Sequence, residues 1–240
     1  MHPLTTLLLS LLPLTSALPP PPRRIPTSRE SAILGRRILA LTPLGTIATV
    51  FPSSSPRQPA NVAGAPHAIM SYLADCEDSG YPTILALPIE TTFRNVAAGS
   101  NVSLALAWTP PFAPSKRILA GGVAGPSEYS AANQPRFSLV GEIEAIADDG
   151  DAAELAACFV RAHPDARYWL PGNRIHEAHF VRLVVKAVYW VGGFGDRAYI
   201  GWIPVEEWTG VKREEWEAVR LPGEEKGWKE WSLREEEGDL

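Results

Sequence analysis

The segment from Cys158 to Trp208 constrains the fold of this chain more than any other part of the sequence. A short helical stretch ends at His163-Pro164, because proline cannot continue a helix. A long strand over residues 179–191 follows, rich in β-branched and aromatic residues. Gly192-Gly193-Phe194-Gly195 then turns the chain into a second strand over residues 197–202. The segment supplies neither a catalytic nucleophile nor a set of metal ligands, so it predicts an architecture rather than a reaction.

The two faces of the predicted long strand differ in character, because successive side chains of a strand point to opposite sides. The apolar face is expected to lie against the core and consists of Val181, Leu183, Val185, Ala187, Tyr189 and Val191. The mixed face is expected to lie against a partner or a ligand and consists of Phe180, Arg182, Val184, Lys186, Val188 and Trp190.

The rest of the sequence predicts a mainly β domain with helices at its periphery. Thr27-Ser28-Arg29-Glu30 fits a capping box, and the apolar residues after it predict a helix over residues 28–40. A short helical turn over residues 89–97 and a helix over residues 151–162 are also expected. Runs rich in β-branched residues predict further strands over residues 44–51, 67–74, 81–88, 102–108 and 137–147. A chain of about six or seven strands with helices between them predicts a small β-barrel.

The two ends of the chain differ in composition from this predicted domain, residues 28–208. Residues 1–17 are a short apolar run closed by small residues, which predicts a signal peptide; a disordered apolar N-terminus is the alternative. Residues 18–27 predict a proline-rich linker. Residues 209–240 form an acidic tail with tryptophans, which either docks on the domain or stays disordered. We expect a soluble protein without a membrane span, secreted or endolysosomal or vacuolar.

The charge and the cysteine content limit which classes of partner and which cellular compartment we expect. The formal net charge is −5 and most of the acidity lies in the tail, with no basic stripe, which argues against a nucleic acid partner. Cys76 and Cys158 either form a disulfide, as in many secreted proteins, or remain buried thiols. Asn101-Val102-Ser103 is a glycosylation sequon, so we expect a glycoprotein that carries carbohydrate at Asn101.

Catalytic and metal-binding motifs are not evident. His176 and His179 are spaced by three residues, whereas helical zinc sites need a spacing of four, so no metal site is expected. No set of serine, histidine and carboxylate suggests acyl transfer, and no catalytic residue is predicted.

Several short motifs, taken in their order, resemble a known family. They include Gly45-Thr46-Ile47-Ala48-Thr49, Thr92-Phe93-Arg94-Asn95, Arg161-Ala162-His163-Pro164 and Val191-Gly192-Gly193-Phe194-Gly195. From about residue 31 to residue 208 the chain resembles the pyridoxamine-phosphate-oxidase-like, FMN-binding split-barrel proteins, and within them the secreted CREG-like branch. The proline-rich insertion over residues 110–135 and the tryptophan-rich tail depart from that pattern.

The resemblance implies a split barrel that forms a homodimer, with a flavin, where one is bound, at the subunit interface. It places the FMN phosphate near Thr91, Thr92, Arg94 and Asn95, where hydroxyl, amide and guanidinium donors follow a strand. A helix cap with a solvated arginine explains the same residues without a ligand. His67 and Ser71 lie on the neighbouring predicted strand and are candidates to face the flavin ring.

Two functions follow from the resemblance. In the first, the protein is an FMN-dependent oxidoreductase whose cofactor performs the chemistry. In the second, the barrel is a non-catalytic scaffold that acts through contacts with protein partners. The second is preferred, because the predicted phosphate cluster is small and the proline-rich insertion is long enough to cover a pocket.

Overall fold

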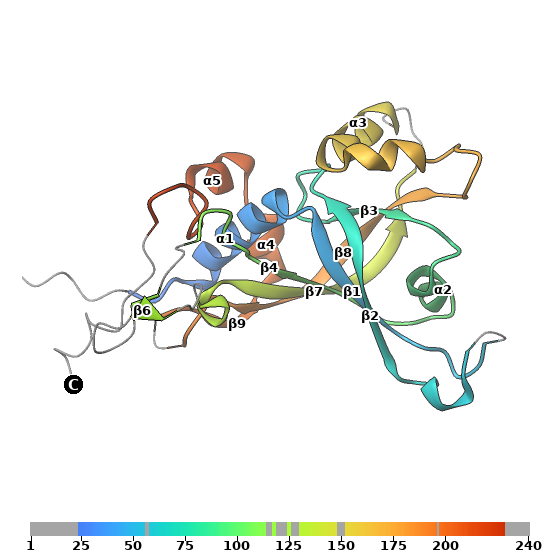
Figure 1. Cartoon of the computed structure of the whole chain (residues 1–240), viewed down its shortest axis with the longest axis horizontal. Helices are drawn as coiled ribbons and strands as arrows, with labels where there is room; N and C mark the ends of the chain where they lie inside the picture. The colour runs from blue at the N-terminus through green and yellow to red at the C-terminus, as the bar shows by residue number, and fades with distance from the viewer. Residues whose placement is uncertain are drawn as a thin grey trace, which may run out of the picture.

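The computed structural model describes residues 24–55, 58–113, 117–118, 124–125, 130–147, 152–195 and 197–228. Its centre is an antiparallel β-barrel with helices around it (Figure 1), which confirms the predicted fold class of a mainly β split barrel. The predicted signal peptide and residues 18–23 of the predicted linker lie outside the described residues. The helices and strands are α1 (Ser28–Leu41), β1 (Leu44–Val50), η1 (Ala60–Val62), β2 (Pro66–Ala74), β3 (Thr83–Ala86), α2 (Thr91–Ala97), β4 (Val102–Ala107), β5 (Arg117–Ile118), β6 (Ala124–Gly125), η2 (Ala131–Asn133), β7 (Arg136–Ala145), α3 (Ala152–Ala162), η3 (Pro164–Tyr168), β8 (His179–Val191), β9 (Ile200–Ile203), α4 (Val205–Thr209) and α5 (Arg213–Ala218).

The barrel is closed by one short strand. Its strands follow the order β3-β2-β1-β4-β7-β8, and pairing of β3 with β8 closes the ring, while β9 extends the sheet beyond β8. β3 pairs with β2 only at Leu73 and Ala74. The first part of β2 therefore has β1 as its one strand neighbour within the described part of the chain. The barrel is split at this place.

A β-bulge in β8 separates the strand into two halves. Val140 and Gly141 are consecutive in β7, but they pair with Ala187 and Val185, so Lys186 is the additional residue of β8. Gly141 permits this approach, because a Cβ atom there would lie 2.1 Å from the carbonyl oxygen of Val184.

The bulge changes which residues of β8 reach the core. Before it, Leu183 and Val185 are buried, as the alternation predicts. After it, Val188 and Trp190 are buried and Tyr189 is 40% exposed. The prediction that Tyr189 belongs to the core face is therefore wrong, because one additional residue shifts the alternation by one position.

α1 packs against the barrel together with the segment that follows β9. Gly35 allows a close approach, since a Cβ atom there would lie 2.7 Å from the ring of Trp208. Arg36 is fully buried and donates hydrogen bonds to the carbonyl oxygens of Trp208, Val211 and Asp78. These contacts join α1 to α4 and to the loop between β2 and β3.

The first part of the acidic tail docks on the domain. Val211, Trp216 and Leu221 are buried in the same core as α1. Arg29 and Glu215 form an ion pair of 2.5 Å, and Arg37 and Glu224 form a second one. Of the two alternatives for the tail, docking therefore holds for residues 209–228, while residues 229–240 lie outside the described part.

A second apolar cluster lies between the barrel and α3. Phe159 of α3 is fully buried and contacts Phe180 of β8 edge-on, with ring centroids 5.4 Å apart. His163 follows α3 and has its Nε2 atom 2.9 Å from the carbonyl oxygen of Leu73. Cys158 of α3 forms a disulfide with Cys76, which follows β2, with an S–S distance of 2.10 Å. α3 therefore covers the outer side of β3 and of the first half of β8 (Figure 1).

Candidate functional site

The residues of the predicted phosphate cluster point to different sides of α2. α2 is seven residues long, and it buries Thr92 and Asn95 while it exposes Arg94. The amide of Asn95 donates a hydrogen bond of 3.1 Å to the hydroxyl of Thr49, inside the barrel end. Asn95 therefore fixes α2 on β1, and its amide is not presented to a ligand.

Thr91 and Arg94 are the members of the predicted cluster that reach the surface. The Arg94 guanidinium donates a hydrogen bond of 3.3 Å to the hydroxyl of Thr91, one turn earlier in α2. No other partner of Arg94 is found among the described residues. Together they provide one cation and one hydroxyl at the surface, fewer donors than a phosphate group needs for a closed site.

The two predicted ring contacts lie on the inner side of β2. His67 is paired with Thr49 of β1, so the two side chains lie on the same side of the sheet, the side on which Thr49 is buried. The imidazole of His67 lies 5.2 Å from the ring of Phe51, and its Nε2 atom is buried without a hydrogen bond. Ser71 is paired with Gly45 in the same way.

The six predicted flavin contacts therefore do not converge on one accessible surface. The Oγ1 atom of Thr92 is also buried without a hydrogen bond, like Nε2 of His67. Neither atom has surface that a ligand can touch. The residues of this chain do not fit an FMN phosphate and ring as a set, and we derive no chemical step through a flavin.

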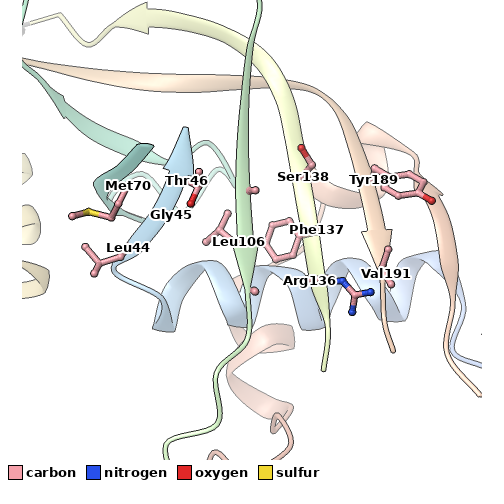
Figure 2. A pocket seen from close by; sticks show the side chains of 12 residues that line it. Leu44, Gly45, Thr46, Met70, Leu106, Arg136, Phe137, Ser138, Tyr189 and Val191 are labelled. Carbon is pink, nitrogen blue, oxygen red and sulfur yellow. The ribbon is translucent and has the colours of Figure 1, made fainter. Parts of the chain in front are cut away.

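A different surface of the barrel has the form of a binding site. On the outer side of the sheet, a groove of about 470 Å³ crosses β1, β2, β4, β7 and β8. Figure 2 shows Leu44, Thr46 and Met70 on one side of this groove and Arg136, Tyr189 and Val191 on the other. We call this surface the outer face and define it by Leu44, Met70, Thr46, Ala105, Ala107, Ser138, Arg136, Tyr189, Val191 and Trp202.

One row of paired residues runs across the outer face from strand to strand. Each residue lies opposite the next, in the order Met70, Thr46, Ala105, Ser138, Tyr189 and Trp202. The residues in the middle are small and those at the two ends are large. The outer face is therefore a shallow trough with apolar walls, and a flat or complementary surface fits into it.

The large side chains of the outer face are unusually exposed for apolar residues. Leu44 is 45%, Met70 53%, Tyr189 40% and Trp202 60% exposed. The rings of Tyr189 and Trp202 contact each other edge-on, 5.1 Å apart. Arg136 is the charged residue of the groove, and it donates hydrogen bonds to the carbonyl oxygens of Ala132 and Gln134. Contiguous exposed apolar surface of this kind marks an interaction site.

The outer face is not predicted by the sequence. Tyr189 was assigned to the core because the bulge at Lys186 leaves no clear signal in the sequence. A usable signal was the second face of β4, where Ala105 and Ala107 alternate with buried Leu104 and Leu106. A strand with apolar residues on both faces is typical of a sheet that is covered on both sides.

A second cavity lies between α1 and α3. We call it the α1–α3 cleft; its volume is about 1170 Å³ and its walls include Leu41, Asp75, Cys76, Cys158 and Arg161. Burial raises the pKa of the Asp75 carboxyl, and the neighbouring Arg36 guanidinium opposes this effect. The cleft contains groups of both charges and shows no preference for one class of ligand.

The other predicted features are found as follows. Asn101 is exposed directly before β4. Within the described ranges, no group of three or more histidine, cysteine or carboxylate side chains is arranged to hold a metal ion. Within the same ranges, none of the helices is both long and apolar enough to cross a membrane.

Solved structures of other proteins are similar to this chain. A heme binding protein from Mycobacterium smegmatis is 23% identical, with a TM-score of 0.55; the match covers 78% of this chain and 62% of that one. A protein of unknown function from Agrobacterium tumefaciens is 21% identical, with a TM-score of 0.49 and coverage of 73% and 61%. An FAD and heme binding protein from Mycobacterium smegmatis is 16% identical, with a TM-score of 0.42 and coverage of 75% and 82%.

This chain thus spans about three fifths of the length of the first two structures. None of the curated proteins matches the sequence. The family described as "CREG, beta-barrel" matches residues 26–210, from the start of α1 to the end of α4. The matched range includes all the strands of the barrel and the helices α1 to α4. The chain belongs to the CREG β-barrel family.

Proposed function

We propose that this protein is a secreted or endolysosomal glycoprotein that forms a homodimer and acts through protein contacts rather than as an enzyme. The observation that carries the proposal is the outer face, a continuous apolar trough that no segment of the described chain covers. Methionine, tyrosine, tryptophan and arginine are the residues enriched at protein interfaces, and Met70, Tyr189, Trp202 and Arg136 provide one of each.

The first partner of the outer face is a second copy of the chain. A sheet with small residues at its centre and large residues at its rim accepts a like sheet face to face, because each rim lies beside the small residues of the other copy. The same symmetric arrangement buries Met70 and Trp202 in both copies. Contacts to other proteins then use the surfaces that remain outside the dimer.

The competing function is that of an FMN-dependent oxidoreductase with the flavin at the dimer interface. It needs a phosphate site, whereas Thr92 and Asn95 are buried and the Asn95 amide is bonded to the Thr49 hydroxyl. Thr91 and Arg94 alone offer few contacts to a phosphate. For this reason the non-catalytic function is supported better.

The oligomeric state of the secreted, glycosylated protein tests the proposal. Sedimentation velocity over a concentration series is expected to show a dimer. Met70→Glu and Tyr189→Glu place a charge in the apolar trough and are expected to weaken the dimer about a hundredfold. Ile175→Glu is the matched control, because Ile175 is 72% exposed on a loop outside the outer face. A monomer at all concentrations, or equal behaviour of all three variants, would contradict the proposal.

A flavin titration distinguishes the two functions. The absorbance spectrum of the native protein is recorded first, and FMN is then added to wild type and to Arg94→Ala. The proposal expects no flavin band and no saturable binding. A stoichiometric flavin that Arg94→Ala weakens would support the oxidoreductase, since Arg94 is the one cation of the predicted phosphate cluster.

The secretory part of the proposal has a separate test. Expression of the full chain in a secreting eukaryotic host is expected to yield protein in the medium, cleaved near residue 17. Its mass is expected to include one N-linked glycan, which Asn101→Gln removes because Asn101 is exposed. Intracellular protein that retains residues 1–17 would contradict this part.

A further inference from the structure

The Cys76–Cys158 disulfide lies in the wall of the α1–α3 cleft. Both cysteines are partly exposed. The cleft has a volume of about 1170 Å³, which is ample for a small thiol reagent to enter. The cleft therefore offers a reductant a route to this disulfide in the folded protein, which a disulfide inside a packed core lacks.

The two halves of α3 are attached to the barrel by different means. The second half is held by packing, because Phe159 is fully buried and His163 directly after the helix is 4% exposed. The first half, residues 152–157, has no buried side chain. In it, Leu155 and Ala156 are partly buried against the second cluster, and the other four residues are exposed.

The disulfide lies at the boundary between these halves. Cys158 directly precedes Phe159, and its bond to Cys76 is the covalent connection of α3 to the segment that follows β2. Without that bond, the first half of α3 keeps only the contacts of two partly buried side chains. At a helix end with so little packing, local opening has a low free-energy cost.

We propose that the Cys76–Cys158 disulfide is a reducible latch that holds the first half of α3 closed over the α1–α3 cleft. The reductant is a small thiol or dithiol of the compartment, which enters through the cleft. Reduction leaves Phe159 and His163 in place, so that residues 152–157 open while the barrel and the second half of α3 stay folded. The cleft becomes wider, and access to it depends on the redox state.

The chemistry of the latch is a thiol–disulfide exchange. The thiolate of the reductant attacks one sulfur of the disulfide, forms a mixed disulfide and displaces the other cysteine as a thiolate, which takes up a proton. A second thiol of the reductant then displaces the first cysteine. The protein gains two thiols, and the reductant leaves as its own disulfide, so two electrons pass from the reductant to the protein.

Hydrogen–deuterium exchange of the full chain with and without dithiothreitol tests the latch. Amides of residues 156–161, which in the helix donate to the carbonyl oxygens of residues 152–157, are expected to exchange at least about tenfold faster after reduction. The amides of β8 and of His163, whose N–H donates to the Phe159 carbonyl, are expected to keep their rates. The double variant Cys76→Ser, Cys158→Ser is expected to show the fast pattern under both conditions. Mass spectrometry after thiol alkylation monitors the extent of reduction.

Three results would overturn the proposal. If the amides of residues 156–161 stay protected after complete reduction, packing alone holds the first half of the helix. If the whole domain loses protection at once, the disulfide is a global staple and not a latch. If dithiothreitol reduces the disulfide only after denaturant is added, the cleft does not admit the reagent.

Discussion

The outer side of the barrel is covered at one end and uncovered at the other. At the covered end, Ala74, Leu85 and Phe180 lie under α3 and are at most 8% exposed. At the uncovered end, Met70 and Tyr189 belong to the same two strands, β2 and β8, and are 53% and 40% exposed. Each strand thus passes from a shielded environment to an open one along its own length.

This difference shows which part of the apolar surface the chain shields by itself. α3 follows β7 in the sequence and reaches the adjacent end of the sheet directly (Figure 1). The described chain has no comparable helix for the outer face. Apolar residues of the same strands therefore stabilise the fold at the covered end and remain available for association at the uncovered end.

Among the substitutions that test the difference between the two ends, Phe159→Ala is expected to lower the unfolding free energy the most. The change removes the central side chain of the covered end and leaves a cavity against Phe180, so we expect a loss of about 4 kcal/mol of unfolding free energy. Urea denaturation measures it. Leu155→Ala is the control in the same helix, because Leu155 is only partly buried and is expected to lose less. Equal losses for both variants would show that Phe159 is not the anchor of α3.

Gly141→Ala is expected to have the next largest effect on the unfolding free energy, because it disturbs the bulge that turns Tyr189 outward. The new Cβ atom would lie 2.1 Å from the Val184 carbonyl oxygen, and a backbone atom cannot move aside as a side chain can. We expect a loss of about 3 kcal/mol of unfolding free energy. The neighbouring Glu142→Ala, at an exposed position, is expected to change it by less than about 0.5 kcal/mol. If Gly141→Ala leaves the unfolding free energy unchanged, the close approach of Gly141 to Val184 does not explain the bulge.

The bulge opposite Gly141 also shows how far the fold could be predicted from the sequence. Alternation and β-branched content were sufficient for β1, β2, β4 and β7, whose observed bounds differ from the predicted ones by one or two residues. Alternation failed only inside β8, where a bulge depends on a single glycine of the partner strand. A local pattern cannot record which residue of another strand lies opposite.

The candidate site was harder to predict for a related reason. Thr91, Thr92, Arg94 and Asn95 are adjacent in sequence, but a helix directs them to opposite sides, so two of them are inside. The outer face is assembled in the reverse way, from one or two residues on each of six strands. The register between strands brings them together, and the sequence of one chain does not contain that register in a readable form.

His163→Phe is expected to weaken the covered end by a smaller amount. A phenyl ring keeps the stacking on Tyr72, where the ring centroids are 4.3 Å apart, but it leaves the Leu73 carbonyl without its partner. An unsatisfied buried carbonyl costs about 2 kcal/mol. Thermal unfolding measures the loss, with His179→Phe as the control because the His179 side chain is 53% exposed. If both variants unfold alike, the hydrogen bond to Leu73 contributes nothing.

The smallest effect on folding is expected at the uncovered end, from Trp202→Ser. Trp202 is 60% exposed, whereas Trp190 on the adjacent strand β8 is 1% exposed, so the two tryptophans separate association from folding. At concentrations where the protein is monomeric, Trp202→Ser is expected to change the unfolding free energy by less than about 0.5 kcal/mol, and Trp190→Ser to reduce it by about 4 kcal/mol. At high concentration the proposed dimer buries this ring, so Trp202→Ser is expected to lose the additional stability that association would give to wild type. Unfolding curves of both variants at two concentrations measure these terms, and a concentration-independent loss for Trp202→Ser would mean that Trp202 belongs to the fold of the single chain and not to an interface.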